Sequence, residues 1–205
     1  MNATNNQTLT EVLIVGAGNA AMAAAVAARG RGAAVIVLEK APRSHRGGNS
    51  ALTVHMRFPY RGYDDLIPLM PTTPYADLEG MRNMVSSYSE QQYWDDVMSL
   101  TEGLSDPYLA DQLVTKSSST IQWMRSLGHI WQPTFASPLS ANPVSFEGGG
   151  YSLLERWFEI AERLGIEVQY QTMATDLLKD QSGGVIGVRA LTPFGSHSYY
   201  AKAVI

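Results

Sequence analysis

The stretch from Glu11 to Glu39 constrains the fold of this chain more than any other part of the sequence. A β-branched run at 12–15 leads into a glycine turn, an alanine-rich segment and a second apolar run at 34–38. This order predicts a strand, a helix and a second strand. Strands that are apolar at nearly every position are typical of a parallel sheet covered on both faces. The sequence therefore predicts an α/β fold with a Rossmann-like parallel central sheet.

The glycine turn, GAGNAA at 16–21, has the GxGxxG/A spacing of a dinucleotide-binding fingerprint. Gly16 permits the tight turn, Gly18 lets the backbone approach a pyrophosphate, and Ala21 allows the helix to pack closely on the strand. Glu39 ends the second strand, at about the spacing from the glycine turn along the sequence where an acid binds an adenosine ribose. A purely structural turn and a solvated glutamate are the alternatives, but the complete context favours a nucleotide site.

The fingerprint alone does not separate NAD from FAD, so an NAD(P)-dependent oxidoreductase stays open at this point. The next cluster, Gly47-Gly48-Asn49-Ser50, favours FAD. Its small residues let the backbone run alongside a long ligand, whereas NAD-type folds usually continue from the ribose acid into another helix.

Downstream of this cluster, the pattern predicts a helical segment. Residues 41–74 are rich in Gly, Pro, Arg and Tyr and are expected to form an extended loop with short turns. Helical periodicity covers 75–128, where Asp106 before Pro107 marks a helix start. Residues 131–150 are again expected to be loop.

The C-terminal part predicts one more helix and a set of strands. The helix opens at the triple glycine 148–150 and stops at Gly165. Strands, including a hairpin or meander, are expected near 167–170, 174–178, 185–191 and 199–205. Because Ile205 lies inside an apolar run with no terminating turn, the fold is expected to be incomplete at its C-terminus.

Composition excludes several classes of function. The formal charge of −4, without clustered Lys or Arg, argues against nucleic acid as a partner. The absence of cysteine excludes disulfides, thiolate zinc sites and cysteine nucleophiles. The acidic pairs at 64–65 and 95–96 lack partners at metal-ligand spacing, so no metal site is expected. No signal peptide or membrane span is expected either, which makes a cytoplasmic protein the default.

Together, GAGNAA, LEKAP at 38–42 and RGGNS at 46–50 resemble the flavoprotein family of fumarate reductases, succinate dehydrogenases and 3-ketosteroid dehydrogenases. Within it, the resemblance is strongest to FAD-dependent tricarballylate dehydrogenases, and it covers nearly the whole chain from Glu11. It implies an oxidoreductase that moves hydride between flavin N5 and a small carboxylate, with tricarballylate to cis-aconitate as the best candidate. It also implies an electron-acceptor protein or a quinone pathway as partner.

The polar N-terminus predicts a disordered tail at 1–9, and the resemblance implies a partial FAD-binding domain at 10–205 with a helical segment of about 75–147 inserted in it. It places FAD against a set of small and polar residues: Gly16, Ala17, Gly18, Asn19, Ala20, Ala21, Glu39, Lys40, Gly47, Gly48, Asn49, Ser50 and Ala174.

Asn49 stands where family members with covalent flavin carry a histidine, so FAD is expected to be bound non-covalently, and His45 is expected to be an exposed loop residue. Arg57 and Arg61 are candidates for binding a substrate carboxylate, with solvated loop arginines as the alternative. The family's catalytic residues lie in a later part of those enzymes, so none is nominated in this chain. A truncated, non-catalytic FAD-binding module is the remaining alternative.

Overall fold

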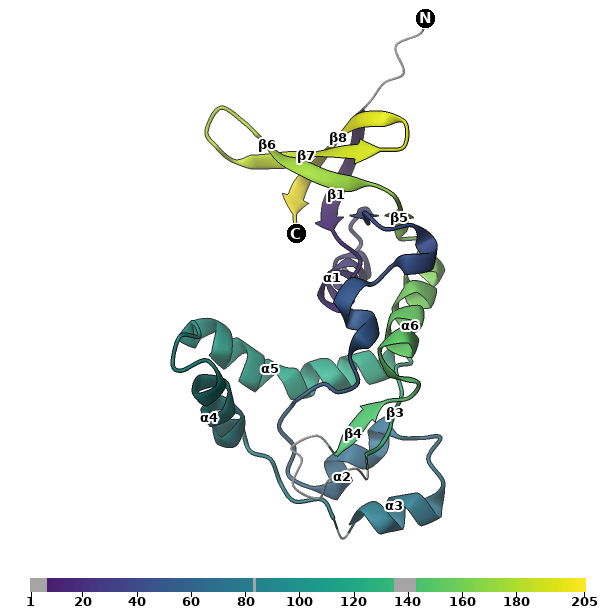
Figure 1. The fold of residues 1–205 in the computed structure, drawn as a ribbon, viewed down its shortest axis with the longest axis vertical. Helices are drawn as coiled ribbons and strands as arrows, with labels where there is room; N and C mark the ends of the chain where they lie inside the picture. Colours follow the sequence, from purple (N-terminus) through teal and green to yellow (C-terminus); the bar gives the residue numbers. More distant parts are fainter. Residues whose placement is uncertain (1–6, 83, 135–142) are drawn as a thin grey trace, which may run out of the picture. The chain divides into compact units, whose positions relative to one another are not determined.

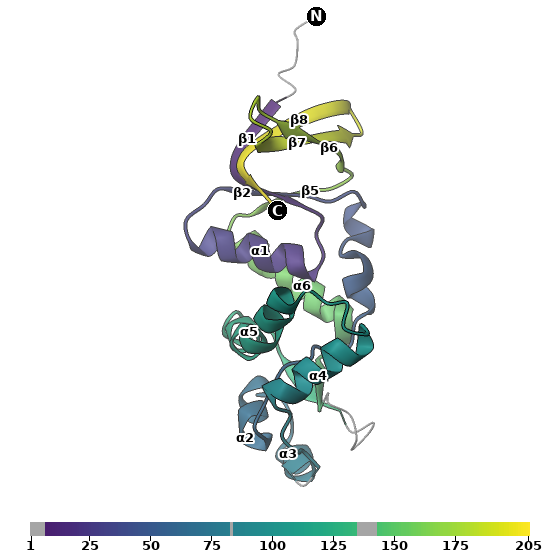
Figure 2. The same ribbon diagram turned by 90° about the vertical axis from the view of Figure 1, so that its left-hand side faces the viewer.

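The computed structural model describes residues 7–82, 84–134 and 143–205, and the chain divides into two compact units. The first unit combines residues from 1–52 with 153–205, and the second comprises 53–152. Figures 1 and 2 show the ribbon in two views related by a quarter turn.

The first unit is built on a six-stranded sheet with the strand order β5-β2-β1-β8-β7-β6. Strands β5, β2, β1 and β8 are parallel, while β6, β7 and β8 form an antiparallel meander. The strands and helices of this unit are β1 (Gln7–Val15), α1 (Asn19–Gly30), β2 (Val35–Leu38), the 3₁₀ turns η1 (Arg43–His45) and η2 (Gly48–Leu52), α6 (Gly149–Arg163, of which 153–163 lie in this unit), β5 (Glu167–Gln169), β6 (Met173–Lys179), β7 (Val185–Thr192) and β8 (Gly195–Val204). This confirms the predicted α/β fold with a parallel central sheet and a meander.

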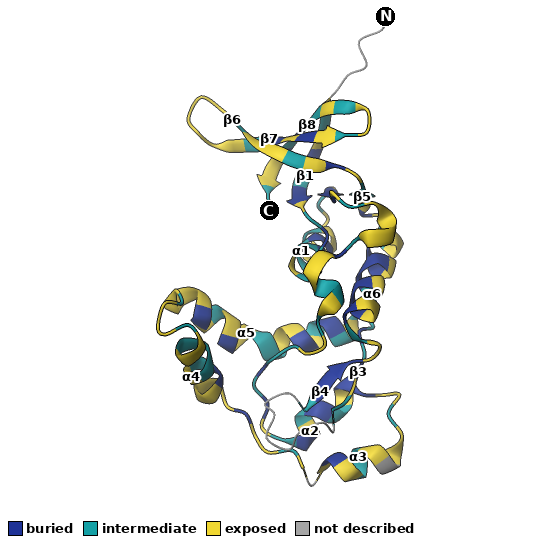
Figure 3. Cartoon of the chain, in the orientation of Figure 1, coloured by how far each residue is buried: buried dark blue, intermediate teal, exposed yellow. Residues whose placement is uncertain are grey.

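Alternation along the central strands explains how both faces of the sheet are buried. Leu13 and Ile36, which are register partners on β1 and β2, join one cluster with residues of β7 and β8 such as Val188 and Tyr199. Their neighbours along the strands point to the opposite face, where α1 packs against β1 and β2. All residues of β2 are consequently buried, whereas the outermost strand β6 is largely exposed (Figure 3).

The described residues correct one boundary expected for the first unit. The tail expected at 1–9 does not extend to residues 7–9, which belong to β1 and pair with residues 198–200 of β8. Residues 1–6 lie outside the described residues. The loop with short turns that is expected after Lys40 contains the turns η1 and η2.

The second unit is mainly helical. Its elements are α2 (Tyr63–Leu66), the 3₁₀ turn η3 (Ile67–Leu69), α3 (Tyr75–Arg82), α4 (Glu90–Leu100), α5 (Pro107–Ser126), β3 (Trp131–Pro133) and β4 (Val144–Phe146). The helix start predicted at Asp106 is confirmed as that of α5, since Asp106 Oδ1 accepts hydrogen bonds from the amides of Tyr108 and Leu109 at 2.9 and 3.1 Å.

Short elements of the second unit differ from the expectation. The loop expected at 131–150 contains the antiparallel pair β3 and β4, in which the buried rings of Trp131 and Phe146 lie 5.4 Å apart between centroids. The loop expected at 41–74 includes α2 and η3. The unit begins at Thr53, earlier than the helical segment of about 75–147 that the sequence suggests.

Candidate cofactor site

A cavity of about 340 Å³ opens where β1 and β2 end in the first unit. This is the edge at which open α/β sheets bind nucleotides, because the loops that leave the carboxyl ends of parallel strands converge there. The residues that line the cavity come from both strand ends, the 47–50 loop and the start of β6: Val15, Gly16, Ala17, Gly18, Leu38, Glu39, Lys40, Gly47, Gly48, Asn49, Ser50, Thr172, Met173 and Ala174.

The glycine turn has the backbone geometry that its sequence requires. Gly16 lies at φ +94°, a region that side chains disfavour, and its amide donates to the carbonyl of Leu38 at 2.7 Å. Gly18 is the N-cap of α1 and offers no side-chain cap to the first amides of the helix. The turn therefore leaves the positive end of α1 facing the cavity, which suits an anionic ligand.

Glu39 connects the two strand ends. Its side chain is buried at 7 % exposure, Oε2 accepts from the amide of Ala17 at 2.9 Å, and Oε1 accepts from the amide of Ala41 at 2.8 Å. Each oxygen of an ionised carboxylate has a second acceptor position, so the group can still receive hydroxyl donors from a ribose. The carboxylate is held in place by the backbone of the glycine turn itself.

Ser50 lies directly over the N-terminus of α1. Its Oγ accepts from the amide of Asn19 at 3.0 Å, and a Cβ placed on Gly18 would lie 3.3 Å from the same oxygen. The Oδ1 atom of Asn19 in turn accepts from Trp157 Nε1 at 2.8 Å, which ties α1 to α6. The 47–50 loop and the fingerprint turn are thus in contact, as a ligand spanning both would require.

Gly47 allows this loop to lie close to α6. It has φ +97°, and a Cβ on it would come 2.1 Å from Cδ1 of Leu154. Only a glycine fits there without displacing the leucine. The residues present therefore fit a long nucleotide cofactor: a narrow backbone cradle, a helix start with a glycine at its N-cap and one buried acid.

The structure brings together most of the residues expected to contact FAD. Asn19, Ala20 and Ala21 do not line the cavity but form the first turn of α1. Four lining residues were missed: Val15, Leu38, Thr172 and Met173. The first two are the last residues of the apolar strands and were identifiable from the strand ends, whereas 172–173 reach the cavity only through the pairing of distant strands.

The candidate substrate arginines lie in the second unit and are both paired. Arg57 Nη1 donates to Asp96 Oδ2 at 2.8 Å, and Arg61 forms a two-pronged pair with Asp65 at 2.9 and 3.1 Å. A substrate carboxylate would have to displace these partners, and the role of Arg57 stays a prediction. His45 is exposed and contacts Ser44, as expected of a loop histidine.

No cluster of three or more metal-ligating side chains occurs within 7–82, 84–134 and 143–205. Among those same residues, none of the helices is long and apolar enough to cross a membrane. The cytoplasmic location stays a prediction.

Comparison with known proteins agrees with this geometry. Residues 11–53 match a family model described as an FAD binding domain. Fumarate reductase (cytochrome) of Shewanella frigidimarina is 24% identical over 198 residues, covering 94% of this chain and 31% of the relative. Urocanate reductase of Eggerthella lenta is 27% identical over 205 residues, covering 95% and 30% respectively. The chain thus spans about a third of the length of these relatives.

The fold is also that of a solved flavoprotein. An open-conformation structure of a flavocytochrome c3 fumarate reductase superposes with a TM-score of 0.74 at 22% identity, covering 97% of this chain and 33% of that one. The fold is therefore that of an FAD-binding flavoprotein domain, and the matched family model and the flavoprotein relatives support FAD as the cofactor.

Proposed function

We propose that the cavity at the ends of β1 and β2 binds FAD non-covalently and that the chain is the FAD-binding part of an oxidoreductase acting on a small carboxylate. The observation that carries the proposal is the convergence of the Gly16 turn, Glu39 and the 47–50 loop on one cavity. The α1 amides and the 47–50 loop would hold the pyrophosphate, and Glu39 the ribose. Asn49, which lines the cavity, offers no nucleophile for covalent attachment.

The substrate class is proposed from the chemistry that the relatives' names share. Fumarate and urocanate are both α,β-unsaturated carboxylates. cis-Aconitate belongs to the same class and tricarballylate is its saturated, reduced counterpart, and we propose this pair as the best candidate. When bound, FAD would supply hydride exchange with the carbon β to such a carboxylate. Electron exchange with a cytochrome is proposed because the name of the Shewanella frigidimarina relative includes one, and exchange with a quinone is proposed from the family resemblance.

The cofactor proposal is tested by titrating the 205-residue chain with FAD and, separately, with NADH. Saturable quenching of flavin fluorescence by FAD binding, which excess NADH does not reverse, is the expected result. A folded chain, judged by circular dichroism, that binds no FAD would refute the proposal.

The substrate proposal requires the complete protein. Reoxidation of its reduced flavin by cis-aconitate, compared with fumarate and urocanate, should rank the acids. Reoxidation by none of the three would exclude the proposed substrate class while leaving FAD binding intact.

A further inference from the structure

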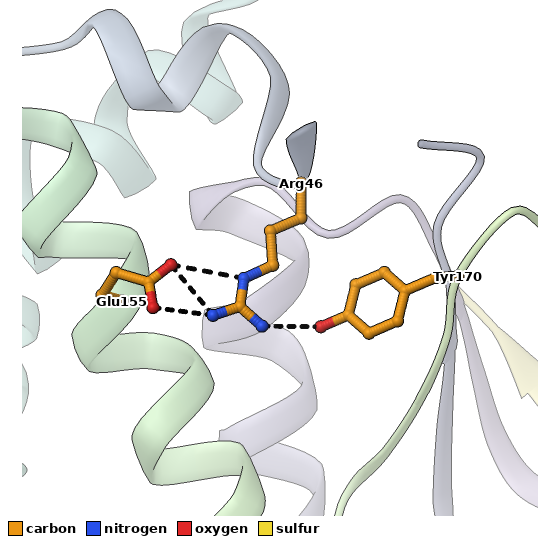
Figure 4. Close-up of polar contacts among 3 residues, drawn as sticks. All are labelled: Arg46, Glu155 and Tyr170. Carbon is orange, nitrogen blue, oxygen red and sulfur yellow. Dashed lines mark hydrogen bonds and ion pairs between the residues drawn. The ribbon is translucent and has the colours of Figure 1, made fainter. Parts of the chain in front are cut away.

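Arg46 is the residue immediately before Gly47, and its guanidinium is held by Glu155 of α6 and by Tyr170, which lies between β5 and β6 (Figure 4). Nη2 donates to both carboxylate oxygens of Glu155 on α6 at 2.9 and 2.7 Å, and Nε donates to Oε1 at 3.3 Å. Nη1 donates to the hydroxyl of Tyr170 at 2.9 Å, and the guanidinium carbon lies 3.8 Å from the ring centroid of Phe158. The Arg46 side chain is only 11% exposed, whereas that of Glu155 is 58% exposed, so the charge-assisted, forked interaction is shielded from water on the side of the arginine only.

This cluster lies apart from the cofactor cavity. Arg46, Glu155 and Tyr170 line a separate cavity of about 440 Å³ that shares no residue with the cavity at the strand ends. Burial acts against the charge of Arg46, but the bonds with Glu155 and Tyr170 outweigh it and raise the arginine pKa. The guanidinium therefore stays charged, and its charge is directed at Glu155 rather than at the cofactor cavity.

The three residues lie next to different walls of the cofactor cavity. Arg46 precedes Gly47, which rests against Leu154, the neighbour of Glu155. Tyr170 stands two residues before Thr172, which lines the cavity and whose amide donates to the carbonyl of Glu39 at 2.9 Å. One guanidinium thus links the 47–50 loop, the segment just before β6 and α6.

We propose that Arg46 is a positioning residue, which sets the affinity for FAD by fixing the 47–50 loop to α6 and to the segment before β6. The inference rests on the proposed function. A preorganised loop loses less freedom when the ligand binds, so loosening it weakens binding without removing a direct contact.

A double-mutant cycle on the full chain tests the proposal with FAD as the probe. Arg46→Met and Glu155→Gln are each expected to weaken FAD binding about ten-fold. The double variant is expected to bind FAD no more weakly than the single variant with the lower affinity, because both substitutions break the same link. Arg46→Lys keeps the charge but cannot reach both Glu155 and Tyr170, so it is expected to lose affinity as well.

Matched controls remove similar charges nearby. Arg43 lies in η1, the turn that ends just before Arg46, and Glu159 lies on α6, as Glu155 does. Arg43→Met and Glu159→Gln, at two exposed side chains, are expected to leave FAD affinity unchanged. Loss of affinity in Arg46→Met but not in Glu155→Gln would overturn the proposal in favour of direct phosphate contact. A lower unfolding temperature of the FAD-free protein with unchanged affinity would overturn it in favour of a purely structural role. Failure of the unmodified chain to bind FAD would instead overturn the proposed function itself.

Discussion

Glu39 is expected to contribute both to folding stability and to FAD binding, and a substitution can separate the two contributions. Its carboxylate satisfies the amides of Ala17 and Ala41, and it also faces the cavity proposed for the ribose. Glu39→Ala should lower the free energy of unfolding by about 1–3 kcal/mol, because two backbone amides lose their buried acceptor. It should also weaken FAD binding, measured by fluorescence titration, more than the loss of stability alone explains.

Glu11→Ala is the matched control for this experiment. Glu11 also accepts from a backbone amide, that of Ala34 at 3.0 Å, but it does not line the cavity. Its removal should leave FAD affinity unchanged. If Glu39→Ala destabilises the chain and binds FAD normally, the glutamate is structural and the ribose assignment is wrong.

Gly47 and Gly48 allow a second comparison at the level of single residues. Both have positive φ, at +97° and +53°, but only a Cβ on Gly47 meets a neighbour, Cδ1 of Leu154. Gly47→Ala should therefore lower the free energy of unfolding by roughly 1–3 kcal/mol more than Gly48→Ala, whose cost is the backbone strain of about 1 kcal/mol alone. Urea unfolding measures the difference.

Removing the obstructing side chain tests the cause. Adding Leu154→Ala to Gly47→Ala should cost less than the sum of the two single changes, because the clash disappears. Strictly additive effects would show that Gly47 is needed for its backbone conformation only.

At the scale of elements, the cap of α5 gives a defined contribution to stability. Asp106 Oδ1 accepts two amides in the first turn, and Pro107 follows at the first helical position. Asp106→Ala should lower the free energy of unfolding by about 1 kcal/mol, with urea as denaturant. Asp111→Ala, at an exposed site inside the same helix, should have a much smaller effect; equal losses would mean that the cap contributes nothing specific.

The elements that the sequence predicted well are those whose signals are local. Residues 12–15, the glycine turn and Glu39 form one contiguous pattern, and Asp106 before Pro107 is a local helix start. Strand pairing across long sequence distances has no such signal. Residues 7–9 became part of β1 because β8 supplies a partner, although the polar residues that precede them and the side chains of Gln7 and Thr8 suggest a tail.

The candidate site follows the same division. Its glycine turn, acid and 47–50 loop were predictable from residue type and spacing, whereas Thr172 and Met173 reach the cavity through the path of the chain between β5 and β6. The strands β3 and β4 are three residues each, too short for a period to be detected. The contacts of Arg46 likewise depend on α6 and Tyr170, which lie far away in the sequence.

At the scale of the molecule, three buried tyrosines of the second unit make its stability depend on pH. The rings of Tyr60, Tyr88 and Tyr93 follow one another at centroid distances of 6.1 and 5.8 Å. Burial raises the pKa of all three hydroxyls above the usual value of 10.0, and at Tyr88 a hydrogen bond to Asp96 at 2.7 Å adds to the effect, against the opposing charge of Arg57.

A raised pKa means that the folded state retains protons which the unfolded state releases. The stability is therefore fully present below about pH 10 and falls as the pH rises further, since unfolding then ionises the phenols. Urea unfolding between neutral pH and about pH 11 should show this decline. In the folded protein, tyrosinate absorbance should rise at a higher pH for these residues than for exposed tyrosines.

Substitution identifies the tyrosines responsible. The double variant Tyr60→Phe and Tyr93→Phe should have a shallower alkaline decline, because neither ring then gains a charge on unfolding. Tyr75→Phe and Tyr108→Phe, at side chains 76% and 70% exposed, should leave the slope unchanged. Burial also raises the pKa of Tyr199 in the first unit, so part of the alkaline loss of stability should remain in every variant. An unchanged slope in the double variant would mean that groups outside this cluster govern the alkaline stability.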